Sequence, residues 1–169
     1  MYMIDDLDTV IELIDVPQCS TGAPCPAIIS GEHLLHLAYY LPEQDDWDGK
    51  TVRFENGQRS DERCALVRFH GAYSHMFGPP NDEAFEGHPL YKRGLRPYSV
   101  AEVKNSSWIR VLERMNSVHR YHKPASFAAM RHFIFPFHDS TFECVADSFE
   151  LSIERGFVSD VLRTSCKDF

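Results

Sequence analysis

The sequence predicts an α+β protein with a single domain over residues 1–169, in which a helix covers one face of an antiparallel sheet. Three observations predict this class. Early segments alternate as strands do, one segment has helical periodicity, and a phenylalanine-rich segment has the parity of a hairpin. A chain of 169 residues is also the size of one domain, and it can bury a core without cross-links.

The first half of the chain contains the expected strands. Residues 8–16 fit a short helix or a strand, and we favour a strand that ends at Pro17. Residues 33–41 are fairly apolar on both faces, which is typical of a central strand. Residues 64–77 alternate along their whole length, so we expect one strand there, bent at most at Gly71.

Residues 78–98 are expected to form a functional loop. They contain four prolines and three glycines, and they are too many for a simple connection in a compact domain. Loops of this length usually take part in function unless they are disordered. The side chains that can hold this loop on the core are Phe85, Leu90 and Tyr91.

The main helix is predicted over about 99–119, packed on one face of the sheet. Its start has two alternatives: a capping box of Ser99 with Glu102, or a later cap at Asn105 or Ser106. Apolar residues at helical spacing predict the stripe that faces the sheet, and they are Trp108, Ile109, Leu112 and Met115, with His119 at the end.

A C-terminal hairpin is predicted over about 131–151, with Phe137 opposite Phe142. On the polar side this register places His132 opposite Asp147. On the other side it produces an unbroken apolar face, which consists of Phe133, Phe135, Phe137, Phe142, Cys144 and Ala146. We expect this face to pack against the helix.

Pro136 determines the predicted turn of this hairpin. Proline has no N–H to donate, so it fits a position whose nitrogen points away from the partner strand. This favours a four-residue loop over 138–141, with Pro136 opposite Glu143. We therefore expect residues 131–137 to form an edge strand, or one bulged at Pro136, which would permit strand addition or self-association.

Composition excludes several classes of protein. The formal charge of −8 makes a nucleic-acid partner unlikely, because such affinity comes mainly from lysine and arginine. Five cysteines without a C-x-x-C pair do not make a disulfide framework. The N-terminal segment is acidic, and no apolar run approaches the roughly 20 residues of a membrane helix. We expect a cytoplasmic protein without a membrane partner.

Nine histidines suggest a metal site with a possible divalent metal. The set of ligands that best fits the predicted strands and loops is His70, His88, His138 and Glu143. Such a set would leave an open position for an activated water. The alternative is that these side chains are ordinary surface or turn residues.

Acid–base chemistry without a metal is a further hypothesis. His132 opposite Asp147 has the arrangement in which a carboxylate orients a catalytic base, and His138 and Glu143 lie near each other at the turn. A cross-strand salt bridge is the alternative for the first pair. No glycine-rich phosphate or dinucleotide loop is present, so no organic cofactor is expected.

The run "RHFIFPFHDSTFECVA", preceded by "NSSWIRVLERMNSVH", resembles a segment of small bacterial proteins that have no assigned function. The resemblance covers about residues 65–150. It implies a stand-alone bacterial protein, and it implies no activity, cofactor or catalytic residue.

Two functions are compatible with these observations. The first is a non-catalytic binding protein, acidic and soluble, which recognises a protein partner or a small molecule through the 78–98 loop and the hairpin edge. The second is a metal-dependent or histidine-based enzyme, a hydrolase or isomerase, with the ligand set given above. The distances between those four side chains distinguish the two.

Overall fold

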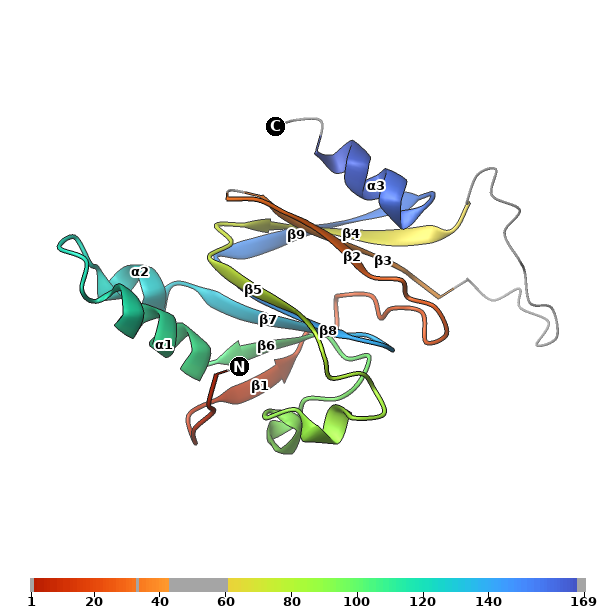
Figure 1. Cartoon of the computed structure of the whole chain (residues 1–169). Helices are drawn as coiled ribbons and strands as arrows, with labels where there is room; N and C mark the ends of the chain where they lie inside the picture. Colours follow the sequence, from red (N-terminus) through yellow and green to blue (C-terminus); the bar gives the residue numbers. More distant parts are fainter. Residues whose placement is uncertain (1, 33, 43–60, 167–169) are drawn as a thin grey trace.

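Alternating apolar residues build two antiparallel sheets that pack face to face across one core (Figure 1). The computed structural model describes residues 2–32, 34–42 and 61–166. The larger sheet has the order β1 (Thr9–Glu12), β6 (Ala101–Lys104), β7 (Arg131–Pro136), β8 (Thr141–Ala146) and β5 (Ser74–Gly78). The smaller sheet has the order β2 (Ala27–Ser30), β3 (Leu35–Tyr40), β4 (Arg63–His70) and β9 (Ser148–Arg155).

Helices cover the outer faces of both sheets, which confirms the predicted α+β class. The outer face of the larger sheet is covered by the N-terminal segment, the 78–98 loop and α1 (Ser107–Asn116), with α2 (Pro124–Ala128) next to α1. The outer face of the smaller sheet is partly covered by α3 (Val158–Ser165). Two short 3-10 helices, η1 (Phe85–Gly87) and η2 (Tyr91–Arg93), lie within the 78–98 loop.

The core between the sheets contains the predicted phenylalanine face. All six residues of that face are buried there, as the alternation in β7 and β8 requires. They meet apolar side chains of the smaller sheet, among them Leu35, Leu37 and Phe69. The expectation that this face packs against the helix is wrong, because α1 lies on the opposite face of the larger sheet. The predicted central strand is confirmed, because β3 pairs with β2 on one side and β4 on the other.

The expected single strand over 64–77 is instead two strands in different sheets. The chain leaves β4 at His70 and enters β5 at Ser74, while β8 and β9 are likewise joined through Asp147. Residues 71–73 lie opposite only residues 146–147, and this extra residue bends the ribbon from one sheet into the other. Gly71 is required at the bend, because its φ is +61° and a Cβ atom would overlap the Asp147 carboxylate.

The main helix begins at Ser107, so the predicted start at residue 99 is wrong and the later cap is confirmed. Ser106 accepts a hydrogen bond from the backbone N–H of Ile109 at 3.3 Å. The alternative capping box fails because Glu102 lies in β6. Trp108 packs on the sheet as predicted, whereas Met115 is 69% exposed because α1 extends beyond the sheet edge at that end.

The hairpin has the predicted parity, but its register differs by two residues. Its predicted end at residue 151 is also wrong, because β8 ends at Ala146 and residues 148–151 belong to β9 in the smaller sheet. Phe142 pairs with Phe135 rather than with Phe137. The turn is tighter than expected, because the N–H of Phe137 donates to the carbonyl of Ser140 at 2.8 Å. A shift of two residues keeps every side chain on its predicted face, so the apolar face was predicted correctly from the wrong partners.

The prediction that residues 131–137 form an edge strand is wrong, because β7 lies between β6 and β8. Pro136 is accommodated in a different way. Its nitrogen points toward the β6 side, but the pairing with β6 ends at Ala101 and Ile134. The hairpin therefore offers no free edge at β7 for strand addition or self-association.

Candidate functional site

The four residues of the proposed metal site do not converge. His88 Nε2 lies 3.2 Å from Glu143 Oε1, but the other two histidines lie elsewhere. His70 is an exposed residue that contacts Glu150 at 3.4 Å, and His138 contacts Asp82. Within residues 2–32, 34–42 and 61–166, no group of three or more histidine, cysteine, aspartate or glutamate side chains is arranged to hold a metal ion.

Glu143 is the centre of a buried hydrogen-bond network on the outer face of the larger sheet. Its Oε2 accepts from the Tyr2 hydroxyl at 2.7 Å and lies 2.9 Å from His132 Nε2. Its Oε1 lies 3.2 Å from His88 Nε2. We call these four residues the Glu143 network. Both histidine side chains are fully buried, so solvent does not reach the carboxylate through them.

A backbone N–H orients one of the two histidines, and a serine hydroxyl orients the other. The N–H of Leu90 donates to His88 Nδ1 at 3.1 Å, so Nε2 of His88 carries a proton and donates to Glu143. On the other side, His132 Nδ1 lies 2.9 Å from the hydroxyl of Ser106, the residue that caps α1. The network thus joins the 78–98 loop, the N-terminal segment and α1 to the sheet.

The network keeps Glu143 ionised. Burial on its own raises the pKa of this carboxyl, but the hydrogen bonds from His132, His88 and Tyr2 outweigh burial and hold the pKa at about 2. The phenol of Tyr2 responds in the opposite direction, because burial and the neighbouring carboxylate both raise its pKa. A closed group of this kind orders the fold.

The predicted pairing of His132 with Asp147 is wrong. With the observed register His132 lies opposite Val145, and its carboxylate partner is Glu143. Asp147 is exposed at the bend of the ribbon, next to Gly71. The difference of two residues in the hairpin register therefore changes the carboxylate partner of His132 from Asp147 to Glu143.

His138 belongs to a second, accessible cluster at the base of the 78–98 loop. Its Nδ1 lies 2.9 Å from Asp82 Oδ2, and Tyr98 donates to the same oxygen at 2.5 Å. The hydrogen bond with Asp82 raises the pKa of His138, and the hydrogen bond from Tyr98 lowers the pKa of Asp82. Since Asp82 binds Nδ1, the Nε2 atom of His138 is left on the exposed side, and this side chain is 40% exposed.

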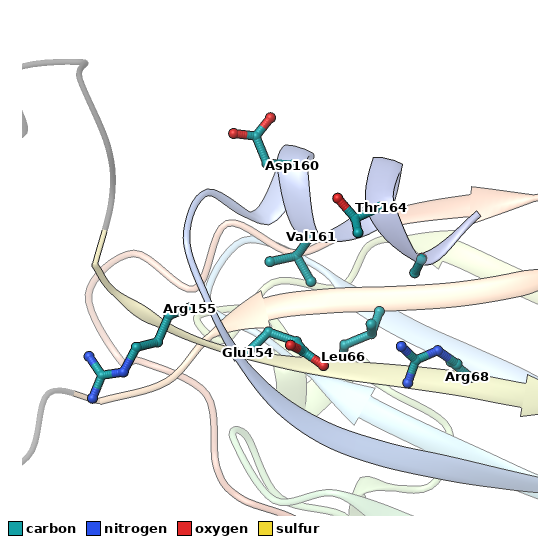
Figure 2. Close-up of a pocket in the computed structure, with 8 residues that line it drawn as sticks. Leu66, Arg68, Glu154, Arg155, Asp160, Val161 and Thr164 are labelled. Atoms are coloured by element: carbon teal, nitrogen blue, oxygen red, sulfur yellow. The ribbon is translucent and has the colours of Figure 1, made fainter. Parts of the chain in front are cut away.

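A cavity of about 310 Å³ lies between α3 and the outer face of the smaller sheet (Figure 2). Sequence reasoning placed no candidate residue there. The side chains that line it are Leu66, Arg68, Glu154, Arg155, Asp160, Val161, Thr164 and Ser165. Strands β4 and β9 supply the floor, and α3 supplies the other wall.

Arg68 and Glu154 face the same part of this cavity. Figure 2 shows the guanidinium and the carboxylate pointing toward each other past Leu66. They are joined through Ser152, whose hydroxyl accepts from Arg68 Nη1 at 3.2 Å and donates to Glu154 Oε1 at 2.7 Å. In the described part of the chain, Arg68 has no carboxylate within ion-pair distance. Arg155 points away from the cavity and donates to the backbone of Asp61.

One signal in the sequence could have identified Arg68. It is a charged residue in the middle of a strand whose neighbours, Val67 and Phe69, are buried. The outer face of a covered strand seldom holds an arginine unless that arginine has a partner or a function. Its neighbours on β9 lie more than eighty positions further along the chain, and their pairing with β4 cannot be predicted from local patterns.

No protein family, curated protein or solved structure matches this chain. The resemblance to small bacterial proteins therefore stays a prediction. None of the five cysteines is in a disulfide, and all five lie in the described residues. In that same part of the chain, no helix has the length and apolar character needed to cross a membrane.

Proposed function

We propose that this protein is a non-catalytic binding protein that holds a small zwitterionic molecule, of the size of a free amino acid, in the cavity beside α3. The observation that carries the proposal is the pair Arg68 and Glu154. Two opposite charges face one cavity, and neither has an ionic partner among the described residues. A ligand with a carboxylate and an ammonium group would pair with both.

Arg68 is suited to the carboxylate. A guanidinium has five N–H donors in a fixed plane and binds carboxylates through two parallel hydrogen bonds. Among the described residues, only one donor group of Arg68 has a partner, the hydroxyl of Ser152. Charge-assisted hydrogen bonds of this kind contribute more than neutral ones, so Arg68 is expected to dominate the affinity.

Glu154 is suited to the ammonium group. Its Oε1 accepts from Ser152, which leaves Oε2 to accept a further donor. The cavity volume of about 310 Å³ is at the lower end of the range for small-molecule sites, roughly 300–1,000 Å³. A volume of this size favours a compact polar ligand over a nucleotide or a peptide.

The other expected recognition surfaces have less support. The 78–98 loop buries Phe85, Leu90 and Leu95 against the larger sheet, so its apolar side chains are not offered to a partner. The hairpin offers no free edge at β7. Recognition of a small molecule beside α3 is therefore the form of binding that we favour.

The test is a ligand screen on the intact chain. We expect at least one free amino acid to raise the melting temperature in a thermal-shift assay, with a dissociation constant then measured by calorimetry. Arg68→Gln should weaken binding at least about tenfold, which corresponds to ~1.4 kcal/mol. Arg114→Gln, which removes an exposed positive charge on α1, should leave affinity unchanged. No binding by any amino acid, or equal binding by both variants, would reject the proposal.

A second candidate function has one specific observation in its favour, the contact of His138 with Asp82. A carboxylate that binds Nδ1 of an exposed histidine orients it as a general base. The histidine-based enzyme thus stays a proposal with a different carboxylate from the one expected. Hydrolysis of an activated ester should be lost in His138→Gln and reduced in Asp82→Asn, whereas equal rates in all three proteins would remove this candidate.

A further inference from the structure

Strand β9 is the edge of the smaller sheet, and its eight residues pair with β4 on one side only. The N–H of Gly156 donates to the carbonyl of Glu62 at 3.1 Å, which fixes the hydrogen-bond parity of this pair. In an antiparallel pair, alternate residues exchange hydrogen bonds with the neighbouring strand. The backbone groups of Phe149, Leu151 and Ile153 therefore point away from β4.

These outward groups have no backbone partner among residues 2–32, 34–42 and 61–166. The side chains on the same residues face the inner side of the sheet. Phe149 and Leu151 are partly buried against the core, and Ile153 is 44% exposed. A long edge with free backbone groups and apolar side chains is the usual template for pairing with another strand.

We propose that a second copy of this chain pairs with this edge, β9 against β9, in an antiparallel two-fold dimer. The two smaller sheets would then form one continuous eight-stranded sheet. A two-fold axis makes the contact self-complementary, because the same strand supplies both sides. This inference uses the strand edge only and does not rest on the proposed ligand.

The charges along β9 select the register of this pairing. With the axis at Leu151, Phe149 faces Ile153 of the second copy and Glu150 faces Ser152 of the second copy. Arg155 then faces Asp147 of the second copy, at both ends of the contact. With the axis moved to Ser152, Glu150 would face Glu154 of the second copy twice, and like charges directly opposite each other are destabilising. The axis at Leu151 is therefore favoured.

The other edge strands fit this role less well. Strands β1 and β2 have four residues each and β5 has five, so each offers fewer backbone hydrogen bonds than β9. With the two-fold axis at Leu151, the β9–β9 contact contains three hydrogen-bonded residue pairs. Leu151 pairs with Leu151 of the second copy, and Phe149 pairs with Ile153 of the second copy twice, once in each direction. The two residues of each hydrogen-bonded pair exchange two backbone hydrogen bonds. Strand length therefore favours β9 over the other edge strands.

The first test uses proline at the free edge. The chain mass is 19.5 kDa, so light scattering after gel filtration should give twice this value for the wild type at high concentration. Ile153→Pro removes an outward N–H without touching the β4 pairing and should give a monomer. Ile153→Ala keeps that N–H and is the matched control, which should retain dimer. Circular dichroism confirms that each variant is folded.

A monomeric wild type across the accessible concentration range would overturn the proposal. So would a folded Ile153→Pro variant that stays dimeric, because the contact would then lie elsewhere.

The second test fixes the register by disulfide formation, in a background with exposed Cys25 replaced by serine. Residues that face each other in non-hydrogen-bonded pairs of an antiparallel ladder lie close enough for a cross-strand disulfide. The double variant Glu150→Cys with Ser152→Cys should cross-link two chains, and Ser152→Cys alone should not. Cross-linking of the single variant would overturn the axis at Leu151, and cross-linking of neither would overturn the β9 contact.

Discussion

The outer faces of the two sheets differ in whether their charged side chains have partners within the fold. On the larger sheet the carboxylate of Glu143 is covered by the N-terminal segment, the 78–98 loop and α1, and it accepts hydrogen bonds from three side chains. On the smaller sheet α3 leaves part of the face open, and Arg68 and Glu154 are joined through Ser152. The charged group on the larger sheet has its hydrogen-bond partners inside the fold, whereas the two charged groups on the smaller sheet face a cavity.

This difference separates structural from functional charge. A buried ionised group must have its partners within the fold, because leaving it unpaired costs several kcal/mol. A partly exposed group with unused donors is tolerated by solvent and is free to bind something else. Two of the histidines considered in the sequence, His88 and His132, lie on the closed face, whereas the candidate site on the open face contains an arginine and a glutamate.

The largest expected effect is the loss of Glu143. In Glu143→Ala the hydrogen-bond donors of Tyr2 and His88 lose their acceptor in a buried site, so we expect roughly 3–5 kcal/mol of destabilisation by urea unfolding. Glu150→Ala is the matched control, since Glu150 is another strand glutamate next to a histidine but is exposed. Its effect should stay within about 0.5 kcal/mol. A similar loss of unfolding free energy in both variants would contradict the proposed difference between buried and exposed charges.

The pH dependence sharpens the same comparison. The pKa of Glu143 is about 2 in the folded protein and 4.5 in a free side chain. Its ionised form therefore stabilises the fold fully above pH 4.5, and this contribution is lost as the pH falls toward 2. The difference in unfolding free energy between wild type and Glu143→Gln should shrink over that interval. A constant difference would show that charge is not the source of the effect.

On the open face, removal of a charge should have little effect on stability. Arg68→Gln is expected to change the free energy of unfolding by less than about 1 kcal/mol, because no ion pair among the described residues is lost. Chemical denaturation without ligand measures this. A loss as large as that for Glu143→Ala would mean that Arg68 is a structural residue.

The smallest effect concerns the base of the 78–98 loop. The hydrogen bond to Asp82 raises the pKa of His138 above its ordinary value of 6.5. The stability that protonated His138 contributes is therefore complete below pH 6.5 and is lost as the pH rises through the raised value. Titration of the ring by NMR should show a higher pKa in wild type than in Asp82→Asn. An identical pKa in both proteins would contradict the contact.

The alternation of residues along each strand predicted which face of the sheet a side chain occupies. It did not predict which residues pair across neighbouring strands. The phenylalanine face was predicted because side-chain direction has a period of two and survives a register shift of two residues. The same shift changed the partner of His132 from Asp147 to Glu143. The turn that sets the register depends on one backbone hydrogen bond, from Phe137 to Ser140, which no local pattern specifies.

The second sheet and the cavity required information that periodicity does not contain. Residues 64–77 alternate without interruption, yet the bend at Gly71 sends the two halves into different sheets. Arg68 meets Ser152 only because β9 returns to pair with β4. Local patterns therefore predict strands and faces, whereas the site depends on pairing between distant segments.

The bent ribbon of β4–β5 and β8–β9 has a consequence for how the chain folds. Its pairs are 78 positions apart at His70 and Ser148 and 92 positions apart at Arg63 and Arg155. Closing such long loops costs entropy before any contact stabilises them, so proteins with many distant pairs fold slowly. During synthesis β3 and β4 leave the ribosome with one apolar face uncovered until β8 has followed. Synthesis is therefore the stage at which this protein most needs protection from aggregation.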